Sequence, residues 1–244
     1  MVGLKAKAAN MLPHQMEYIP MDFLPAIEIE TAPQPTHSVI WLHGLGASGD
    51  DFVPIVPYLG LKTPTRFIFL HAPSRPVTIN AGYVMPAWYD ILSLSSEARQ
   101  IDQTGIVQSI AQVHALIDRE IARGIPAHRI VLVGFSQGGA MAYSAGLTYP
   151  KTLAGVMALS AYLPAPALLT PERCVANQHT PIVVMHGQYD DVVGVPLGQQ
   201  AVTWLTEHDY QVIWQTYPMA HEVSLEQIQQ IGRWFNRHFA QVAP

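Results

Sequence analysis

The segment RIVLVGFSQGGAMA, residues 129–142, gives the clearest structural signal in this chain. Its β-branched run, Ile130–Val133, predicts a buried strand, and its alanine-containing end predicts a helix, so a very tight turn must connect the two. Ser136 lies at the apex of that turn, where the backbone is strained and the positions two before and two after it crowd together. Glycine is favoured at both positions, and Gly134 and Gly138 fill them.

This arrangement is a nucleophile elbow. It exposes the serine hydroxyl above the end of a sheet and aims the first N–H groups of the next helix at the atom that the hydroxyl attacks. A chance loop is the alternative, since a pattern with so few fixed positions recurs often. The predicted strand before the turn and the predicted helix after it favour the elbow, so we interpret Ser136 as a nucleophile.

Length and composition indicate a well-packed globular protein. The chain has 244 residues, of which 49% are hydrophobic and 13% charged, which is too apolar for disorder. We expect a loose N-terminal tail over residues 1–18 and a single domain over residues 19–244. The lone cysteine excludes an internal disulfide and is compatible with a reducing compartment.

Charge and hydropathy narrow the classes of partner. The net charge is −5, and Lys and Arg form no run or stripe, so we expect neither nucleic acid nor an anionic membrane surface as a partner. No apolar stretch reaches the roughly 18 residues of a membrane span, so we expect no stable membrane insertion. The first residues lack the apolar core and cleavage site of a secretory signal, which favours a cytoplasmic protein.

Predicted strands and helices alternate along nearly the whole chain. This order is typical of an α/β fold with a mostly parallel sheet and helices on both faces, whose ligands bind beyond the carboxyl ends of the strands. Residues 73–91 are expected to be irregular, and residues 164–180 to form a proline-bearing loop. The expected strands cover residues 26–30 (an antiparallel edge strand), 38–42, 65–70, 130–133, 154–159, 181–185 and 211–217, and the expected helices cover 103–123, 140–147, 197–208 and a terminal helix after a capping box at 224–227.

A nucleophilic serine needs a base to take its proton, and the base needs an acid to orient it. In α/β enzymes with an elbow, the acid and then the histidine follow the serine along the chain. Asp190 follows the strand at 181–185, and His221 follows the last strand. Asp191 competes with Asp190, which we prefer because adjacent turn residues point in different directions. A solvated Asp-Asp turn and a surface histidine are the alternatives.

Ester hydrolysis also needs two N–H donors for the oxyanion. The backbone N–H of Gln137 is one candidate, and the glycine-rich loop Gly44-Leu45-Gly46 supplies the other, for which we choose Leu45. A phosphate cradle is the competing interpretation of this loop, since residues 44–49 match Gly-x-Gly-x-x-Gly, but the chain lacks Gly-Lys-Ser/Thr.

The other histidines receive a structural interpretation. His43 and His186 each precede a glycine at a strand end, so we expect buried, hydrogen-bonded supports of the two loops rather than catalytic groups. His-x-x-x-His, Glu-x-x-His and paired-cysteine spacings do not occur, so we expect no metal and no cofactor.

The motifs together resemble small carboxylesterases of the phospholipase/carboxylesterase branch of the α/β-hydrolases, which is related to acyl-protein thioesterases and lysophospholipases. The resemblance covers most of the chain and implies a hydrolase core without a large lid, a triad of Ser136, Asp190 and His221, and Leu45 and Gln137 as oxyanion donors. Residues 72–91 resemble the bacterial carboxylesterases of this branch in particular. The other motifs are LHGLG (42–46), GFSQGG (134–139), HGQYDDVV (186–193) and MAHE (219–222).

Two departures from the branch matter. Many relatives have Asp-Pro-Val-Val-Pro after the catalytic turn, whereas this chain has DDVVG at 190–194. The eukaryotic thioesterases also differ around residues 85–91, so their preference for long acyl chains on proteins is not assumed here.

These observations predict a serine carboxylic-ester hydrolase that acts through an acyl-enzyme on small esters with short to medium acyl chains. Deacylation of thioesters or lysophospholipids is the first alternative, and a catalytically silent binding protein is the second. Relatives of this kind are often dimers, which implies a homodimer by analogy alone. Four residues have two open interpretations, the wall of an acyl pocket or ordinary aromatic core: Trp88, Tyr89, Tyr162 and Leu163.

Overall fold

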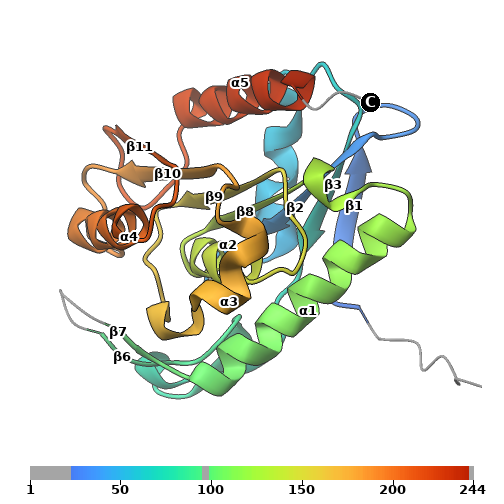
Figure 1. Ribbon diagram of the computed structural model, residues 1–244. Coiled ribbons are helices and arrows are strands. Elements are labelled where there is room, and N and C mark those ends of the chain that lie inside the picture. The colour runs from blue at the N-terminus through green and yellow to red at the C-terminus, as the bar shows by residue number, and fades with distance from the viewer. Residues whose placement is uncertain (1–22, 95–98, 242–244) are drawn as a thin grey trace, which may run out of the picture.

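The computed structural model describes residues 23–94 and 99–241 (Figure 1). The expected tail at residues 1–18 lies outside the described residues, and the single-domain expectation for residues 19–244 stays a prediction. Within the described part of the chain, no helix combines the length and the apolar character that crossing a membrane requires.

A mostly parallel sheet forms the centre of the molecule, as the alternating pattern predicts. Among the described residues it has seven strands in the order β1-β3-β2-β8-β9-β10-β11. Every neighbouring pair is parallel except β1 and β3, so the predicted antiparallel edge strand is confirmed. The strands are β1 (Ala26–Glu30), β2 (His37–Leu42), β3 (Thr65–Leu70), β8 (Ile130–Phe135), β9 (Gly155–Leu159), β10 (Ile182–Gly187) and β11 (Val212–Tyr217).

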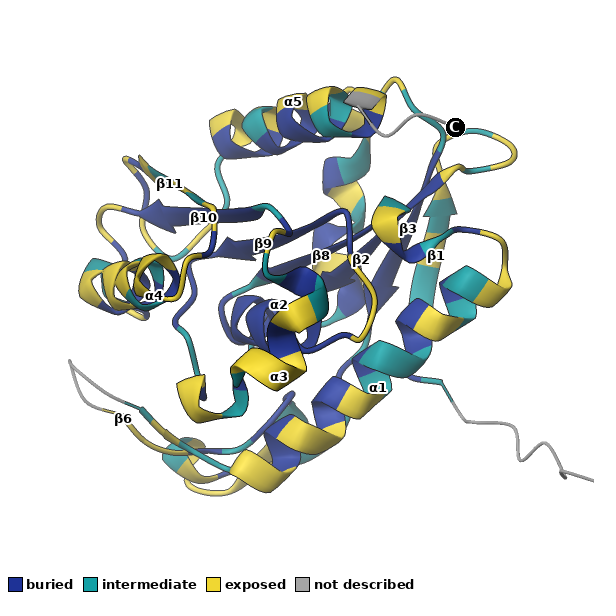
Figure 2. Cartoon of the chain, viewed as in Figure 1, coloured by how far each residue is buried: buried dark blue, intermediate teal, exposed yellow. Residues whose placement is uncertain are grey.

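The helices cover both faces of this sheet (Figures 1 and 2). Because side chains alternate along a strand, Ile40 and Leu42 of β2 join the core beneath α1, α2 and α4, whereas Val39 and Trp41 join the core beneath α5 and a 3₁₀ helix at Gly49–Leu59. The helices are α1 (Gln103–Ala122), α2 (Gln137–Leu147), α3 (Pro171–Cys174), α4 (Val195–Glu207) and α5 (Leu225–Gln241).

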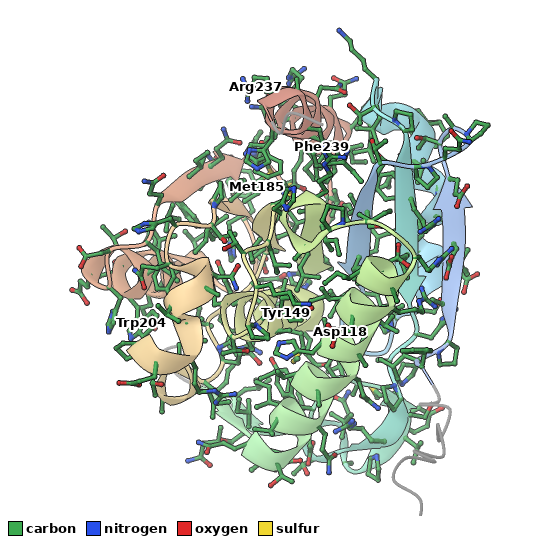
Figure 3. All side chains as sticks on the ribbon, turned by 45° about the vertical axis from the view of Figure 1, so that its right-hand side comes forward. Asp118, Tyr149, Met185, Trp204, Arg237 and Phe239 are labelled. Carbon is green, nitrogen blue, oxygen red and sulfur yellow. The ribbon has the colours of Figure 1, made fainter. Side chains whose placement is uncertain are left out.

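Figure 3 shows one contact that locks the helical layer: Tyr149, just after α2, points toward Asp118 of α1. The Tyr149 hydroxyl donates a hydrogen bond of 2.5 Å to Asp118 Oδ1.

At the start of α5, half of the predicted capping box forms. The N–H of Gln227 donates to Ser224 Oγ at 3.2 Å, but the Gln227 side chain has no partner in the described residues.

The expectation of an irregular segment at residues 73–91 was wrong. The chain there forms a hairpin of β4 (Ser74–Val77) and β5 (Tyr83–Pro86), and a second hairpin, β6 (Ile91–Leu94) and β7 (Arg99–Ile101), follows it. The tight connection of the first hairpin needs positive φ at Ala81 (55°) and Gly82 (76°). Three-to-four-residue strands interrupted by proline give no clear alternation in the sequence, which is why the pattern missed them.

A buried charge cluster fixes the end of α1 against the sheet. Glu120 is fully buried, and its carboxylate accepts hydrogen bonds from Ser38 Oγ (2.6 Å), Arg66 Nη1 (2.8 Å) and Arg123 Nη1 (2.9 Å). Arg66 is itself buried on β3. Paired charges of this kind are costly to separate, because removing one partner leaves the other uncompensated.

We therefore expect Glu120→Ala to lower the free energy of unfolding by about 3 kcal/mol, since it removes the buried carboxylate partner of Arg66 and leaves only the more exposed Glu30. Urea denaturation at neutral pH measures this change. The exposed Glu207 of α4 gives the matched control, and Glu207→Ala should change stability by less than about 0.5 kcal/mol. Equal small losses in both variants would contradict the assigned role of Glu120.

A buried histidine makes stability depend on pH. His37 of β2 stacks on Phe239 with ring centroids 4.2 Å apart, and burial, reinforced by the charge of Arg129, lowers the pKa of His37 from 6.5 to about 4. Between these values the unfolded chain binds a proton that the folded protein does not. Stability therefore falls as the pH falls from 6.5 toward 4.

Lowering the pH from 7 to 5 should reduce the free energy of unfolding of both proteins. We expect this reduction to be about 1–2 kcal/mol smaller in His37→Phe, which keeps the ring stack, than in the unmodified protein. Urea denaturation at the two pH values provides the measurement. The exposed His179 serves as the control, and His179→Gln should leave the pH dependence unchanged. An unchanged pH dependence in His37→Phe would show that other groups cause the acid loss.

Candidate active site

The elbow has the backbone geometry that its sequence predicts. Ser136 lies between β8 and α2 with φ 54° and ψ −120°, a conformation that L-residues rarely adopt. A Cβ atom on Gly134 would lie 2.0 Å from the carbonyl oxygen of Gly138, and one on Gly138 would lie 2.1 Å from that of Leu42. Both positions therefore exclude every residue except glycine, because the atoms in the way are backbone.

The structure brings the three predicted side chains into one hydrogen-bonded chain. The Ser136 hydroxyl lies 2.9 Å from His221 Nε2, and His221 Nδ1 lies 2.7 Å from Asp190 Oδ2. With Asp190 as a carboxylate, Nδ1 of His221 carries the proton and donates a hydrogen bond to Asp190. The lone pair of Nε2 is then free to accept a hydrogen bond from the Ser136 hydroxyl. This is the tautomer that a general base for Ser136 needs.

Two loops must approach closely to place the acid beside the base. Asp190 follows β10 and His221 follows β11, and these strands are parallel neighbours. A Cβ atom on Gly187 would lie 2.2 Å from the carbonyl oxygen of Ala220, so glycine at the end of β10 permits the approach. The glycine of the HGQYDDVV motif therefore has a structural purpose in the site.

The protein holds Asp190 in its charged form. Burial acts to raise the pKa of Asp190, but hydrogen bonds from His221 and from the backbone N–H groups of Val193 (2.7 Å) and Val192 (3.0 Å) outweigh it, and the net pKa lies below the ordinary value. Asp191, the competing acid, is exposed and lines the cavity at Ser136. The structure thus places Asp190 and not Asp191 against His221.

His43 and His186 are the buried supports that their positions predict. His43 Nδ1 donates to the Gly44 carbonyl (2.7 Å), and His43 Nε2 accepts from the N–H of Ala72 (3.0 Å). His186 Nε2 donates to the carbonyl of Val193 (2.7 Å), next to the acid. Burial lowers the pKa of both imidazoles, so each fixes its loop as a neutral group.

The two predicted oxyanion donors lie at the same cavity as Ser136. Leu45 and Gln137 both line it, and Gly44 is so close to Ser136 that a Cβ atom there would touch the serine Cβ at 3.4 Å. Within the described residues, the backbone N–H groups of Leu45 and Gln137 donate to no other protein group. They are therefore available to a substrate oxygen.

The Gln137 side chain has a role that the sequence pattern did not indicate. Its Oε1 accepts from the N–H of Trp88 (2.9 Å), and its Nε2 donates to the carbonyl of Tyr89 (2.8 Å). The Trp88 indole in turn donates to the carbonyl of His43 (2.8 Å), directly before the oxyanion loop. Gln137 thus connects the two predicted donors through side-chain hydrogen bonds, which no spacing in the sequence could indicate.

The cavity at Ser136 has a volume of about 540 Å³ and a mainly apolar lining. Of the four residues considered for an acyl pocket, Tyr162 lines this cavity, and Leu163 lines only a neighbouring one. The acyl-pocket interpretation is wrong for Trp88 and Tyr89, which are fully buried and do not line the cavity, so the alternative of aromatic core applies to them. Their polar atoms bond to Ser109, His43 and Tyr162. The two hairpins supply lining residues that the sequence did not indicate, namely Ile79, Asn80, Ile91, Leu94 and Arg99.

Among the described residues, no group of three or more His, Cys, Asp or Glu side chains is suited to a metal ion. The reactive groups gathered at the site are a hydroxyl, an imidazole, a carboxylate and two backbone N–H groups.

The fold and this site define a serine hydrolase of the α/β-hydrolase fold, of the class that cleaves carboxylic esters. The phospholipase/carboxylesterase family matches residues 25–239, and the chain belongs to that family.

Relatives of known name agree with this assignment. The chain is 40% identical to acyl-protein thioesterase 1 of Neurospora crassa over 90% of its own length and 94% of the relative. It is 38% identical to a probable carboxylesterase of Oryza sativa subsp. japonica, over 82% and 77% of the two chains. The crystal structure of Arabidopsis thaliana SOBER1 is similar with a TM-score of 0.79 and 33% identity, over 83% of this chain and 99% of that one. These relatives are eukaryotic, so they do not support the bacterial part of the resemblance.

The neighbouring aspartates offer a matched test of the site. We expect Asp190→Asn to lower kcat for p-nitrophenyl acetate by about 10³–10⁴-fold, because an amide does not hold the required tautomer of His221. Asp191→Asn should change kcat by less than about threefold, since Asp191 does not contact the imidazole. Steady-state kinetics of both variants decide the point, and a larger loss in Asp191→Asn would reverse the assignment.

Proposed function

We propose that this chain hydrolyses carboxylic esters with short to medium acyl chains through an acyl-enzyme on Ser136. The observation that carries the proposal is the continuous relay from Ser136 Oγ to His221 Nε2 (2.9 Å) and from His221 Nδ1 to Asp190 Oδ2 (2.7 Å). Each distance lies within ordinary hydrogen-bonding range, so proton transfer requires no rearrangement of the three side chains.

In the acylation step, His221 Nε2 takes the hydroxyl proton as Ser136 Oγ bonds to the ester carbonyl carbon. The resulting oxyanion accepts hydrogen bonds from the N–H groups of Leu45 and Gln137. When the tetrahedral intermediate collapses, the bond from carbon to the alcohol oxygen breaks, and His221 returns the proton to the leaving alcohol. The acyl group is then bound to Ser136 as an ester.

Deacylation repeats these events with water as the nucleophile. His221 takes a proton from the water as its oxygen attacks the acyl carbon, the bond to Ser136 Oγ breaks, and His221 returns the proton to the serine. The carboxylic acid leaves, and the enzyme is restored. The buried carboxylate of Asp190 stabilises the imidazolium in both steps, which is why its lowered pKa is useful.

The oxyanion donors give the mechanism its largest electrostatic contribution. Removing one such donor costs about 2.7–4 kcal/mol of transition-state stabilisation in enzymes of this kind. The Gln137 N–H is the first of α2, so the positive end of the helix dipole adds to its effect. Because both donors are backbone groups, substitution of their side chains tests positioning rather than donation.

The preference for short to medium acyl chains follows the resemblance of the chain to small carboxylesterases, and the mainly apolar cavity of about 540 Å³ at Ser136 offers room for an acyl group. A thioesterase activity is the second candidate, because the relative from Neurospora crassa bears that name at 40% identity. Thioesters pass through the same acyl-enzyme, so one site serves both reactions. Lysophospholipids and a silent binding role remain the less supported alternatives.

The expectations about partners stay predictions. We propose a small-molecule ester as substrate, no nucleic-acid partner, no stable membrane insertion and a homodimer by analogy with relatives. A cytoplasmic location is supported by Cys174, the lone cysteine, which is free and buried.

The nucleophile can be tested directly. We expect Ser136→Ala to abolish both labelling by a fluorophosphonate probe and turnover of p-nitrophenyl acetate, without changing the melting temperature by more than a few degrees. The matched control is Ser160→Ala, directly after the neighbouring strand β9. Because the Ser160 hydroxyl is buried and should not react with the probe, this variant should keep both labelling and turnover. Labelling that persists in Ser136→Ala would overturn the proposal.

The acyl preference needs a separate measurement. We expect kcat/KM for p-nitrophenyl esters to be highest between acetate and octanoate and to fall for longer chains, as the proposed preference requires. A preference that rises steadily to palmitate would instead favour the thioesterase or lysophospholipase alternative. Parallel assays with acetyl and octanoyl thioesters then rank ester against thioester cleavage.

A further inference from the structure

A second cavity lies behind the wall of the catalytic one. It has a volume of about 300 Å³, and its lining is mostly apolar. Two side chains, Arg99 and Tyr162, line both cavities and therefore stand between them. The second cavity is otherwise formed by the chain after β9 and by α4, where Trp204 is labelled in Figure 3, and its other lining residues are Leu163, Pro164, Pro166, Leu197, Gln200 and Ala201.

The tyrosine half of this wall is fixed. Tyr162 is buried, and its hydroxyl shares a hydrogen bond of 2.7 Å with the hydroxyl of the fully buried Tyr89. The arginine half is attached more lightly, since Arg99 comes from the start of β7 in a small hairpin. Its Nη2 donates to the carbonyl of Val192 at 2.5 Å, and its guanidinium carbon lies 4.9 Å from the centre of the Tyr162 ring.

The position of Arg99 has a free-energy cost. Its Nε is buried and has no hydrogen-bond partner among the described residues, and a buried donor without a partner is destabilising. A guanidinium is also a poor lining for an apolar cavity. Stability alone therefore does not account for an arginine at this point of the wall.

The acyl chain is the part of the substrate that meets this wall. The leaving alcohol must lie beside His221, which returns a proton to it, and the His221 ring contacts Phe135, which in turn contacts Phe52. This aromatic part of the cavity is the place for the alcohol. The acyl chain is left with the remaining apolar lining, where Leu94 pairs with Arg99 across β6 and β7 and Val192 accepts a hydrogen bond from Arg99.

We propose that Arg99 determines acyl-chain length by closing the catalytic cavity toward the second one. The inference rests on the esterase function proposed above and adds the residue that sets the upper limit of chain length. A chain long enough to reach Arg99 must displace a guanidinium that is held by Val192 and Tyr162. Without the arginine side chain, the chain continues past Tyr162 into the second cavity, where each added methylene strengthens binding by about fourfold.

The test compares two substitutions over p-nitrophenyl esters from acetate to laurate. Arg99→Ala removes the bulk of the wall, and we expect the ratio of kcat/KM for decanoate to that for butyrate to rise by at least about tenfold. Arg99→Met keeps most of the bulk but loses the hydrogen bond, so it should retain a profile close to that of the unmodified enzyme. If Arg99→Ala does not fold, Arg99→Thr takes its place, because threonine suits a strand.

A third variant tests where the longer chain goes. Gln200 is exposed on α4 and lines the second cavity, so Gln200→Trp should fill that cavity from the surface. Combined with Arg99→Ala, it should reverse most of the gain for decanoate, whereas alone it should leave the profile unchanged. A series of acetate esters with lengthening alcohols should respond to none of these substitutions.

The outcomes separate the two proposals. If the unmodified enzyme does not cleave p-nitrophenyl butyrate, the esterase function fails. If it does cleave butyrate but Arg99→Ala keeps the same profile, or if the alcohol series shifts in place of the acyl series, only the role of Arg99 is overturned. Equal losses on all esters in Arg99→Ala and Arg99→Met would also overturn it, because Arg99 would then only brace the loop that carries Asp190.

Discussion

The close approach of backbone to backbone around Ser136 is the constraint from which the rest of the site follows. Gly134 and Gly138 leave no room for a Cβ atom, and Gly138 also lies against the carbonyl of Leu42 at the end of β2. The same contacts that force the strained serine conformation therefore bring the strand of the oxyanion loop beside the nucleophile. The strained backbone of Ser136 and the position of the oxyanion loop therefore have the same cause. The strain could not be relieved without moving that loop.

The protein controls which groups around the site are charged. Asp190 is ionised, its pKa lowered by His221 and two backbone N–H groups, while burial keeps His43 and His186 neutral. The two neutral imidazoles hold the loops by hydrogen bonds without adding positive charge that would compete with His221 for the carboxylate. A protonated His186, 3.5 Å from Asp190 Oδ2, would do so.

A feature of the structure could be predicted from the sequence when residues close together in the chain determine it. The elbow and its flanking strand and helix were predictable because a strict steric requirement leaves a mark at fixed spacing, as at Gly134 and Gly138. Asp190 was preferred over Asp191 because of the order of the motifs along the chain and because adjacent turn residues point in different directions. Only the structure could show that Asp190 contacts His221. The hairpins at residues 74–101 and the burial of Trp88 were not predictable, because short strands pair, and an indole finds its acceptor, only through contacts distant in sequence.

One peptide segment lies between the catalytic acid and the cavity wall. The N–H of Val192 donates to Asp190 Oδ1, and the carbonyl of the same residue accepts from Arg99 at the cavity wall. Under the proposed role of Arg99, an acyl chain that displaces its guanidinium breaks the bond to the Val192 carbonyl and leaves the bond from the Val192 N–H to Asp190 in place. Because the hydrogen bonds from Val193 and His221 also hold Asp190, the acid keeps its place when the contact with Arg99 is lost. The cavity wall and the catalytic relay therefore share one segment without depending on the same hydrogen bond.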